Sequence, residues 1–226
     1  MGRKKATCAY CDAPATTADH IPPKGLFAKP LPANMLTVPS CLLCNGDAAQ
    51  DDEYFRTVMA FRSDTYERSD AAGAAERAMR ALVREGGEGF RNGLLSKLTE
   101  VPVFGDDGAK VDSVGQLDVD LRRVRRVVER VVRGLYYHHK GERLPPDCRI
   151  MVNSLESFES PDANAVATLC EVTRWAMSAE RHVLPRGVLD YRFRETPQDP
   201  ACAVWILGFY EIVPFVVVTA REHSGA

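Results

Sequence analysis

The chain has 226 residues, of which 45% are hydrophobic and 27% charged, with 16 glycines and 14 prolines spread along it. This length and composition exclude collagen, a coiled coil and a disordered chain, and they allow one large domain or two small ones. The 29 Lys and Arg residues against 31 Asp and Glu give a formal net charge of -2, so any site for a polyanion must be local.

The first residues do not have the pattern of a targeting segment. Basic residues 1–5 lead directly into Ala-Thr-Cys-Ala-Tyr-Cys, where a secretory signal would have an apolar run. We therefore expect a cytoplasmic protein whose cysteines are not paired in disulfides.

Four of the seven cysteines form two Cys-x-x-Cys pairs, Cys8/Cys11 and Cys41/Cys44. Two residues between cysteines allow one tight turn to present both sulfurs to one ion, and two such turns complete the tetrahedron that Zn²⁺ prefers. The odd total also favours metal binding over a disulfide framework. We predict a structural zinc ion at these four residues. The remaining cysteines lie among apolar neighbours and are expected to be buried thiols: Cys148, Cys170 and Cys202.

The segment between the two pairs contains a second pattern. It begins with Asp19-His20-Ile21-Pro22-Pro23, continues through an irregular stretch to Asn34 and the run Met-Leu-Thr-Val-Pro-Ser, and Asn45 directly follows the last cysteine. This order resembles the HNH endonuclease family. In that family a strand ends in Asp-His-Ile-x-Pro, a long loop carries an Asn, a second strand leads to a Cys-x-x-Cys pair, and Asn or His begins the next helix. The resemblance covers residues 8–52.

The resemblance implies a ββα-metal finger with a zinc clip at its base. It implies that His20 is the general base, that Asp19 and Asn45 are ligands of a catalytic Mg²⁺ or Mn²⁺, and that Asn34 orients the loop of His20. The chain departs from the family in two places. Residues 24–32 replace a glycine-rich loop, and the acidic residues 47–53 follow Asn45 where the family often has Lys or Arg.

These residue types suit phosphodiester hydrolysis. A histidine with a pKa of about 6.5 can accept a proton from water near neutral pH. A hard cation held by carboxylate and amide oxygens can neutralise charge on the leaving oxygen. Neighbours on a regular strand point to opposite faces, so we expect the strand to end at Asp19 and His20, before Pro22 and Pro23. The alternative is a non-catalytic zinc-finger protein that binds nucleic acid or a protein partner.

Several elements are predicted after this segment. Apolar spacing predicts a helix over residues 51–68, and Ser69 or Asp70 can cap a second helix that ends near Gly86 and Gly87. Residues 101–111 are expected to form a hairpin, and residues 134–141, which include His138 and His139, a loop.

A further helix is predicted over residues 121–135, with valines on one face and arginines on the other. An arginine face is often only a solvated surface. In a slightly acidic protein with a nuclease motif it is also the best candidate for phosphate contacts. The expected nucleic-acid-binding residues are Arg122, Arg123, Arg126 and Arg130.

The C-terminal third is predicted to contain strands at residues 149–153, 191–195, 202–210 and 212–219 and a helix at residues 163–179. Residues 201–220 are apolar, but Glu211 lies in their middle and Gly208 and Pro214 interrupt them, so we expect two buried strands and no contact with a membrane. Trp205, Phe209 and Phe215 are expected in the core.

The predicted class is therefore α+β. Residues 1–55 are expected to form an HNH ββα-metal zinc-finger nuclease domain, and residues 56–226 an accessory domain of helices and antiparallel sheet. The expected function is that of a metal-dependent endonuclease, with DNA as its substrate.

Overall fold

The computed structural model describes residues 6–66, 68, 71–155 and 162–222, and it is a mixed α+β structure with antiparallel sheets. The strands are β1 (Thr17–Ile21), β2 (Leu36–Ser40), β3 (Leu98–Phe104), β4 (Lys110–Leu117), β5 (Cys148–Ser154), β6 (His182–Val183), β7 (Leu189–Thr196), β8 (Asp199–Phe209) and β9 (Val213–Arg221). The helices are α1 (Leu42–Asp47), α2 (Ala49–Ala60), α3 (Ser63–Tyr66), α4 (Ala72–Val83), α5 (Glu88–Leu95), α6 (Leu121–Lys140) and α7 (Ala163–Met177), with short 3-10 turns at Lys24–Leu26 and Pro185–Gly187.

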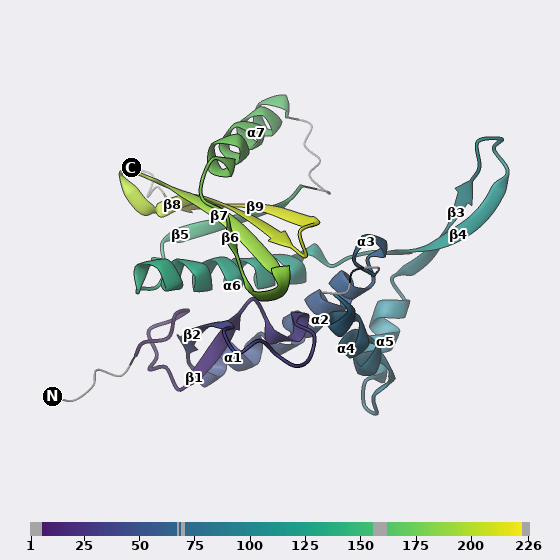
Figure 1. Ribbon diagram of the computed structural model, residues 1–226, viewed down its shortest axis with the longest axis horizontal. Helices are drawn as coiled ribbons and strands as arrows, with labels where there is room; N and C mark the ends of the chain where they lie inside the picture. The colour runs from purple at the N-terminus through teal and green to yellow at the C-terminus, as the bar shows by residue number, and fades with distance from the viewer. Residues whose placement is uncertain (1–5, 67, 69–70, 156–161, 223–226) are drawn as a thin grey trace.

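A five-stranded sheet of order β5-β9-β8-β7-β6 forms the C-terminal part, with α7 on one face and α6 along the other (Figure 1). Along β8, Trp205 belongs to the main core beside α6, whereas Val204 packs with α7. This alternation is that of a sheet buried on both faces. The predicted strands and α7 are confirmed, and residues 201–220 form most of β8 and β9. Trp205, Phe209 and Phe215 are 1%, 0% and 3% exposed, as expected of core residues.

None of the helices in the described parts of the chain has both the length and the apolar character needed to span a membrane. The free thiols differ from the sequence prediction. Cys148 is buried, but Cys202 is only partly buried and Cys170 is exposed on α7. The prediction was wrong for Cys170 because the apolar face of α7 that meets the sheet is formed by other residues, such as Leu169 and Ala176.

Helix α6 is the central element of the molecule, and its predicted valine face is confirmed. The buried positions of this face include Val124, Val127, Val128, Val131 and Val132. The Asp120 side chain caps the helix by accepting a hydrogen bond from the N–H of Arg122 at 3.1 Å.

The helix continues beyond the point where the sequence prediction ended it. Residues 134–140 are helical, so the loop predicted over 134–141 was wrong. Gly141 ends the helix instead, with a φ of 73° and its N–H bonded to the carbonyl of Tyr137. Gly134 has a packing role, because a Cβ there would lie 2.4 Å from Cδ1 of Ile21 on β1. The glycine allows α6 to approach the N-terminal strands.

The N-terminal strands β1 and β2 pair antiparallel and are followed by α1 and α2. They share one hydrophobic core with the rest of the protein, since Ile21, Val38, Val128 and Trp205 belong to the same buried cluster. The boundary expected at residue 55 falls inside α2.

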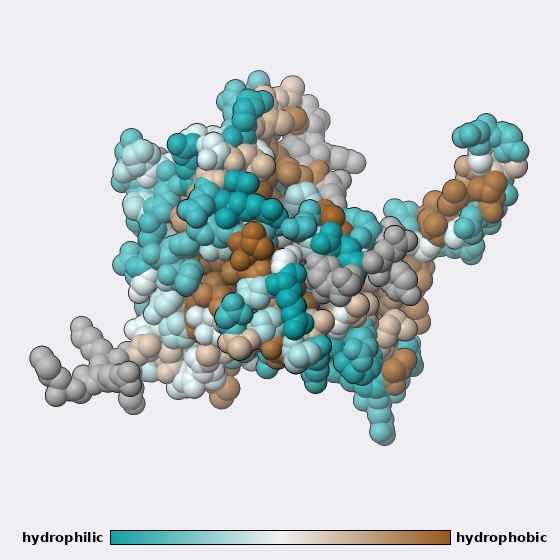
Figure 2. Space-filling view, in the orientation of Figure 1, coloured by the Kyte–Doolittle hydropathy of each residue, from teal (hydrophilic) through white to brown (hydrophobic). Residues whose placement is uncertain are grey.

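The region between α2 and α6 contains the remaining helices and one hairpin. The second predicted helix is α4, which ends at Val83, while its expected caps Ser69 and Asp70 lie outside the described residues. The predicted hairpin is confirmed as β3 and β4, which project from the body (Figure 1). Figure 2 shows hydrophobic side chains along this arm, where Phe104 is 60% and Val111 65% exposed.

Candidate functional site

The four cysteines of the two pairs lie together, with their Sγ atoms all within 4.8 Å of one another. The Sγ of Cys11 is 3.7 Å from that of Cys41 and 3.6 Å from that of Cys44. Zn–S bonds of about 2.3 Å in a tetrahedron place sulfurs about 3.8 Å apart, close to these separations. The cluster could therefore bind a structural metal ion such as zinc.

Local backbone structure positions these sulfurs. Cys41 directly follows β2 and is the N-cap of α1, where its Sγ accepts a hydrogen bond from the N–H of Cys44 at 3.3 Å. In the first turn the N–H of Tyr10 donates to the Sγ of Cys8 at 3.4 Å. Burial alone would raise the pKa of Cys8, but backbone N–H groups lower it to about 7. One sulfur of the cluster is thus readily ionised near neutral pH, whereas burial and the neighbouring thiols raise the pKa of Cys44.

Strand β1 carries Asp19 and His20 and does not end at them. It continues to Ile21, which pairs with Leu36, so the strand end predicted at Asp19 and His20 was wrong by one residue. Ile21 is only 1% exposed, and its burial against Gly134 keeps the strand regular. Asp19 therefore faces inward, at 7% exposure, while His20 lies on the opposite, partly buried face.

Asp19 and Asn45 converge on a single arginine from α6. The Nη2 atom of Arg130 lies 2.8 Å from Oδ2 of Asp19 and 3.4 Å from Oδ1 of Asn45. The hydroxyl of Tyr10 donates to the same Asp19 oxygen, and the guanidinium lies over the Tyr10 ring at 5.2 Å. The Asn45 amide nitrogen donates to Oγ1 of Thr17 at 3.1 Å and to the carbonyl of Ala18. Asn45 thus joins α1 to β1.

Asp52 on α2 is the second carboxylate near Arg130, with Oδ2 3.8 Å from Nη1. Burial raises the pKa of Asp52 to about 6, and the charge of Asp19 adds to this, whereas Arg130 opposes it. A carboxyl group with a strongly raised pKa beside other polar residues is typical of functional sites. From the sequence, the acidic residues 47–53, Asp52 among them, were interpreted as solvated acids of a helix's first turn, with one of them as an alternative metal ligand, and Tyr10 was assigned no role. Asp52 follows Asn45 by two helical turns, and this spacing could have indicated that the two side chains lie on one face. For Tyr10, only its place in the first cysteine turn could have indicated a role.

Among the described residues no hydrogen bond joins His20 to Asn34. Asn34 is exposed in a turn and makes no side-chain hydrogen bond with any described residue, so no contact by which it would orient His20 is present. Burial lowers the pKa of His20, and the charge of Lys24 lowers it further, while Asp19 acts in the opposite direction. His20 is therefore neutral at pH 7, and its imidazole can accept a proton.

The arginine face of α6 lies partly against α2 rather than against solvent. Nε of Arg123 and Nε of Arg126 contact the two carboxylate oxygens of Asp51 at 2.8 and 2.6 Å. Hydrogen bonds from Arg126, and then from Arg123, lower the pKa of Asp51 against the effect of burial. Arg122 remains 84% exposed beside Asp120. These contacts join α6 to α2, and phosphate binding by these arginines stays a prediction.

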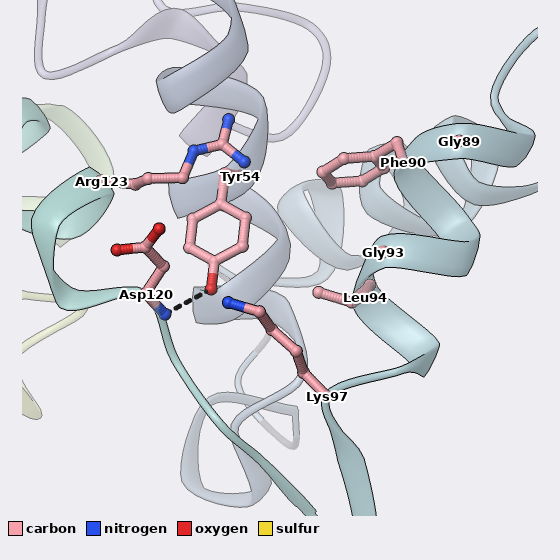
Figure 3. Close-up of a pocket in the computed structure, with 8 residues that line it drawn as sticks. All are labelled: Tyr54, Gly89, Phe90, Gly93, Leu94, Lys97, Asp120 and Arg123. Atoms are coloured by element: carbon pink, nitrogen blue, oxygen red, sulfur yellow. Dashed lines mark hydrogen bonds between the residues drawn. The ribbon is translucent and has the colours of Figure 1, made fainter.

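A separate pocket of about 260 Å³ lies between α2, α5 and the start of α6 (Figure 3). Lys97 extends toward the Tyr54 hydroxyl, which accepts a hydrogen bond from the N–H of Asp120 at 2.8 Å, and Arg123 lies over the Tyr54 ring. Asp19, His20 and Asn45 do not line this pocket.

Comparisons of the chain with models of protein families, with curated proteins and with solved structures found no match. The geometry of the site itself is therefore the basis for a functional proposal.

Proposed function

We propose that the chain is a metal-dependent HNH-type endonuclease that hydrolyses phosphodiester bonds in nucleic acid, with DNA as its substrate. The observation that carries the proposal is the convergence of two oxygens, one from Asp19 on β1 and one from Asn45 on α1, on one cationic atom of Arg130. The resemblance assigns the same two side chains to a catalytic cation. Their shared contact supports this because it brings hard oxygen donors from two elements to one point.

The zinc ion belongs to the proposal as a structural clip of a ββα-metal finger. Cys8, Cys11, Cys41 and Cys44 join the turn before β1 to the start of α1, so an ion bound to them fixes both elements that carry the site. A closed four-sulfur site leaves no position for substrate. The zinc therefore holds the finger together and takes no part in hydrolysis.

The donor chemistry of Asp19 and Asn45 fits a hard divalent ion such as Mg²⁺ or Mn²⁺. Such an ion would compete with the guanidinium of Arg130 for the same two oxygens. When bound, it would supply positive charge to the leaving oxygen of the phosphodiester.

His20 is the proposed general base. It lies on the partly buried face of β1 opposite Asp19, so both side chains can reach one phosphodiester only if the strand opens at this point when substrate binds. Burial lowers its pKa, which favours the neutral imidazole. A neutral imidazole can take a proton from the attacking water, a contribution typically worth about 10²- to 10⁴-fold in rate. Asn45 contributes positioning as well, since its amide group ties α1 to the backbone of β1 beside His20.

Incubation of supercoiled plasmid DNA with the purified chain tests the proposal. The protein is loaded with zinc, freed of other metals, and assayed with added Mg²⁺, added Mn²⁺ or neither. Conversion to nicked or linear DNA that depends on the added cation is expected. Absence of cleavage under all conditions by folded, zinc-loaded protein would contradict it.

A non-catalytic zinc-finger protein that binds nucleic acid or a protein partner is the second candidate. The position of Arg130 favours it, because a guanidinium that neutralises Asp19 gives that carboxylate a structural role without any divalent ion. DNA binding without cation-dependent cleavage in the same assay would select this alternative.

A further inference from the structure

A hollow of about 370 Å³ lies between α2 and α4, and arginines form most of its lining. Its residues are Glu53, Arg56, Arg77, Arg80, Ala81 and Arg84. Arg77, Arg80 and Arg84 follow one another at spacings of three and four, which places them on one face of α4 and its C-terminal cap. Arg56 comes from α2, so two elements supply the lining.

The hollow has more positive than negative charge. Glu53 pairs with Arg84 at 3.1 Å and with Arg56 at 3.6 Å, and Glu76 pairs with Arg80 at 2.8 Å. Three of the four guanidinium groups thus share two carboxylates, while Arg77 donates to the carbonyl of Lys24. Burial lowers the pKa of Arg56, and the nearby charges of Arg77 and Arg84 act in the same direction, whereas those of Glu53 and Asp52 oppose it.

The hydrogen-bond donors of Arg56 are also incompletely used. Its side chain is 16% exposed, and its buried Nε has no hydrogen-bond partner among the described residues. On α6, Asp51 accepts from both Arg123 and Arg126 and Arg130 contacts Asp19, although Nε and Nη1 of Arg130 likewise have no hydrogen-bond partner among the described residues. The α2–α4 hollow therefore has cationic donors in excess, which an anion would satisfy.

The hollow adjoins the loop that follows His20. Nη1 of Arg77 donates to the carbonyl of Lys24 at 2.8 Å, and a Cβ on Gly25 would lie 3.0 Å from Nη1 of Arg56. Lys24 follows His20 by four residues, a span of at most about 14 Å. The basic hollow and the proposed general base thus lie on neighbouring parts of the surface.

We propose that this arginine hollow binds the phosphate backbone of the nucleic acid strand on which His20 acts. The inference rests on the proposed function. Arginine is suited to the task because its planar fork matches phosphate oxygens bidentately. A protein with a net charge of -2 needs such a local site to hold a polyanion.

The double variant Arg80→Ala/Arg84→Ala tests the proposal. These side chains are 57% and 55% exposed, so their removal leaves the fold intact. Binding of a short fluorescent DNA duplex is measured against salt concentration, with the full chain in a His20→Ala background so that the DNA stays uncut. Each phosphate contact contributes roughly 0.9 to the slope of log affinity against log salt, so the slope should flatten by about 2. Affinity near 0.1 M salt should fall by about tenfold to a hundredfold.

A matched control separates a specific site from loss of general charge. Arg149→Ala/Arg174→Ala removes the same charge from exposed positions on β5 and α7 and should bind like the His20→Ala parent. Arg80→Lys/Arg84→Lys should retain most of the slope, because lysine keeps the charge.

The outcomes distinguish this inference from the proposed function. If the wild-type chain cuts DNA and Arg80→Ala/Arg84→Ala binds with the parent's affinity and slope, the hollow assignment is wrong and the nuclease assignment stands. An equal loss in the Arg149→Ala/Arg174→Ala control would also overturn the hollow assignment. If the wild-type chain neither binds nor cuts nucleic acid, both proposals fail.

Discussion

Arg130 is the cation on which the site's polar network depends, and replacing it with methionine tests that network. The side chains of Arg130 and Asp19 are only 14% and 9% exposed. Arg130→Met would leave Asp19 buried beside Tyr10 without its cation, and Asp52 would lose the same partner. Removing one partner of a buried ion pair typically costs about 3–5 kcal/mol. For a chain of this size that loss corresponds to a decrease in Tm of roughly 10 °C.

The loss should depend on pH. The pKa of Asp52 in the folded protein is about 6, above the value of about 3.9 in an unfolded chain. The folded state therefore takes up a proton as pH falls from about 6 toward 4, and this uptake favours folding. Because Arg130 lowers the pKa of Asp52, Arg130→Met should raise that pKa further, so acid removes the Asp52 charge more readily in the variant. The difference in unfolding free energy between the two proteins should thus be largest at pH 7.5 and shrink at pH 5.

Urea unfolding at these two pH values measures the effect. Arg122→Met on the same helix is the control, because Arg122 is 84% exposed and its loss should cost less than about 1 kcal/mol. Mn²⁺ adds a second readout, since a cation bound by Asp19 and Asn45 should stabilise Arg130→Met by about 2.7 kcal/mol at a hundred times its Kd. The reasoning would be refuted if Arg130→Met were as stable as Arg122→Met at pH 7.5.

Three further predictions concern the zinc cluster, the packing of α6 and acid stability. Cys41→Ser should release zinc, measured by elemental analysis, and unfold the N-terminal strands; folded, active protein without zinc would contradict this. Gly134→Ala should destabilise the protein by about 1–2 kcal/mol, because overpacking against Ile21 exceeds the helix preference for alanine. Gly93→Ala, which meets open space, should instead be neutral or stabilising in the same thermal unfolding assay, and equal effects of the two would refute the packing argument. Burial and neighbouring cationic groups lower the pKa of His139 to about 4, below its unfolded value of about 6.5, so stability should fall as pH drops between these values, by about 1–2 kcal/mol once solvent screening of this partly exposed side chain is allowed for. His139→Phe should abolish much of that acid loss, and an unchanged pH profile of unfolding would exclude His139 as its source.

Patterns within single elements were readable from the sequence. The valines of α6 recur at helical spacing, and this spacing predicted a helix. The apolar runs that form β8 and β9 are interrupted by residues typical of turns, which predicted two separate strands. The cysteine cluster was predictable because two tight turns present sulfurs in a way that depends only on local spacing.

Contacts between distant elements were not readable in this way. Arg130 was expected to face phosphate, but it lies under β1 because the valine face of α6 meets the sheet and turns Arg130 toward Asp19. From the sequence, Gly134 was interpreted as the start of a loop. In the structure it is helical, and because it has no Cβ, α6 can pack closely against Ile21. The basic hollow depends on the packing of α4 against α2, which no spacing within one helix specifies.

The rate of plasmid cleavage by His20→Ala, compared with wild type at equal zinc content, tests the nuclease assignment most directly. His20 contacts neither the four-cysteine cluster nor Arg130 among the described contacts, so its removal should leave folding and DNA binding unchanged. We predict a loss of about 10²- to 10⁴-fold in the Mg²⁺- or Mn²⁺-dependent rate, the usual contribution of a general base. Full cleavage activity in His20→Ala would contradict the assignment.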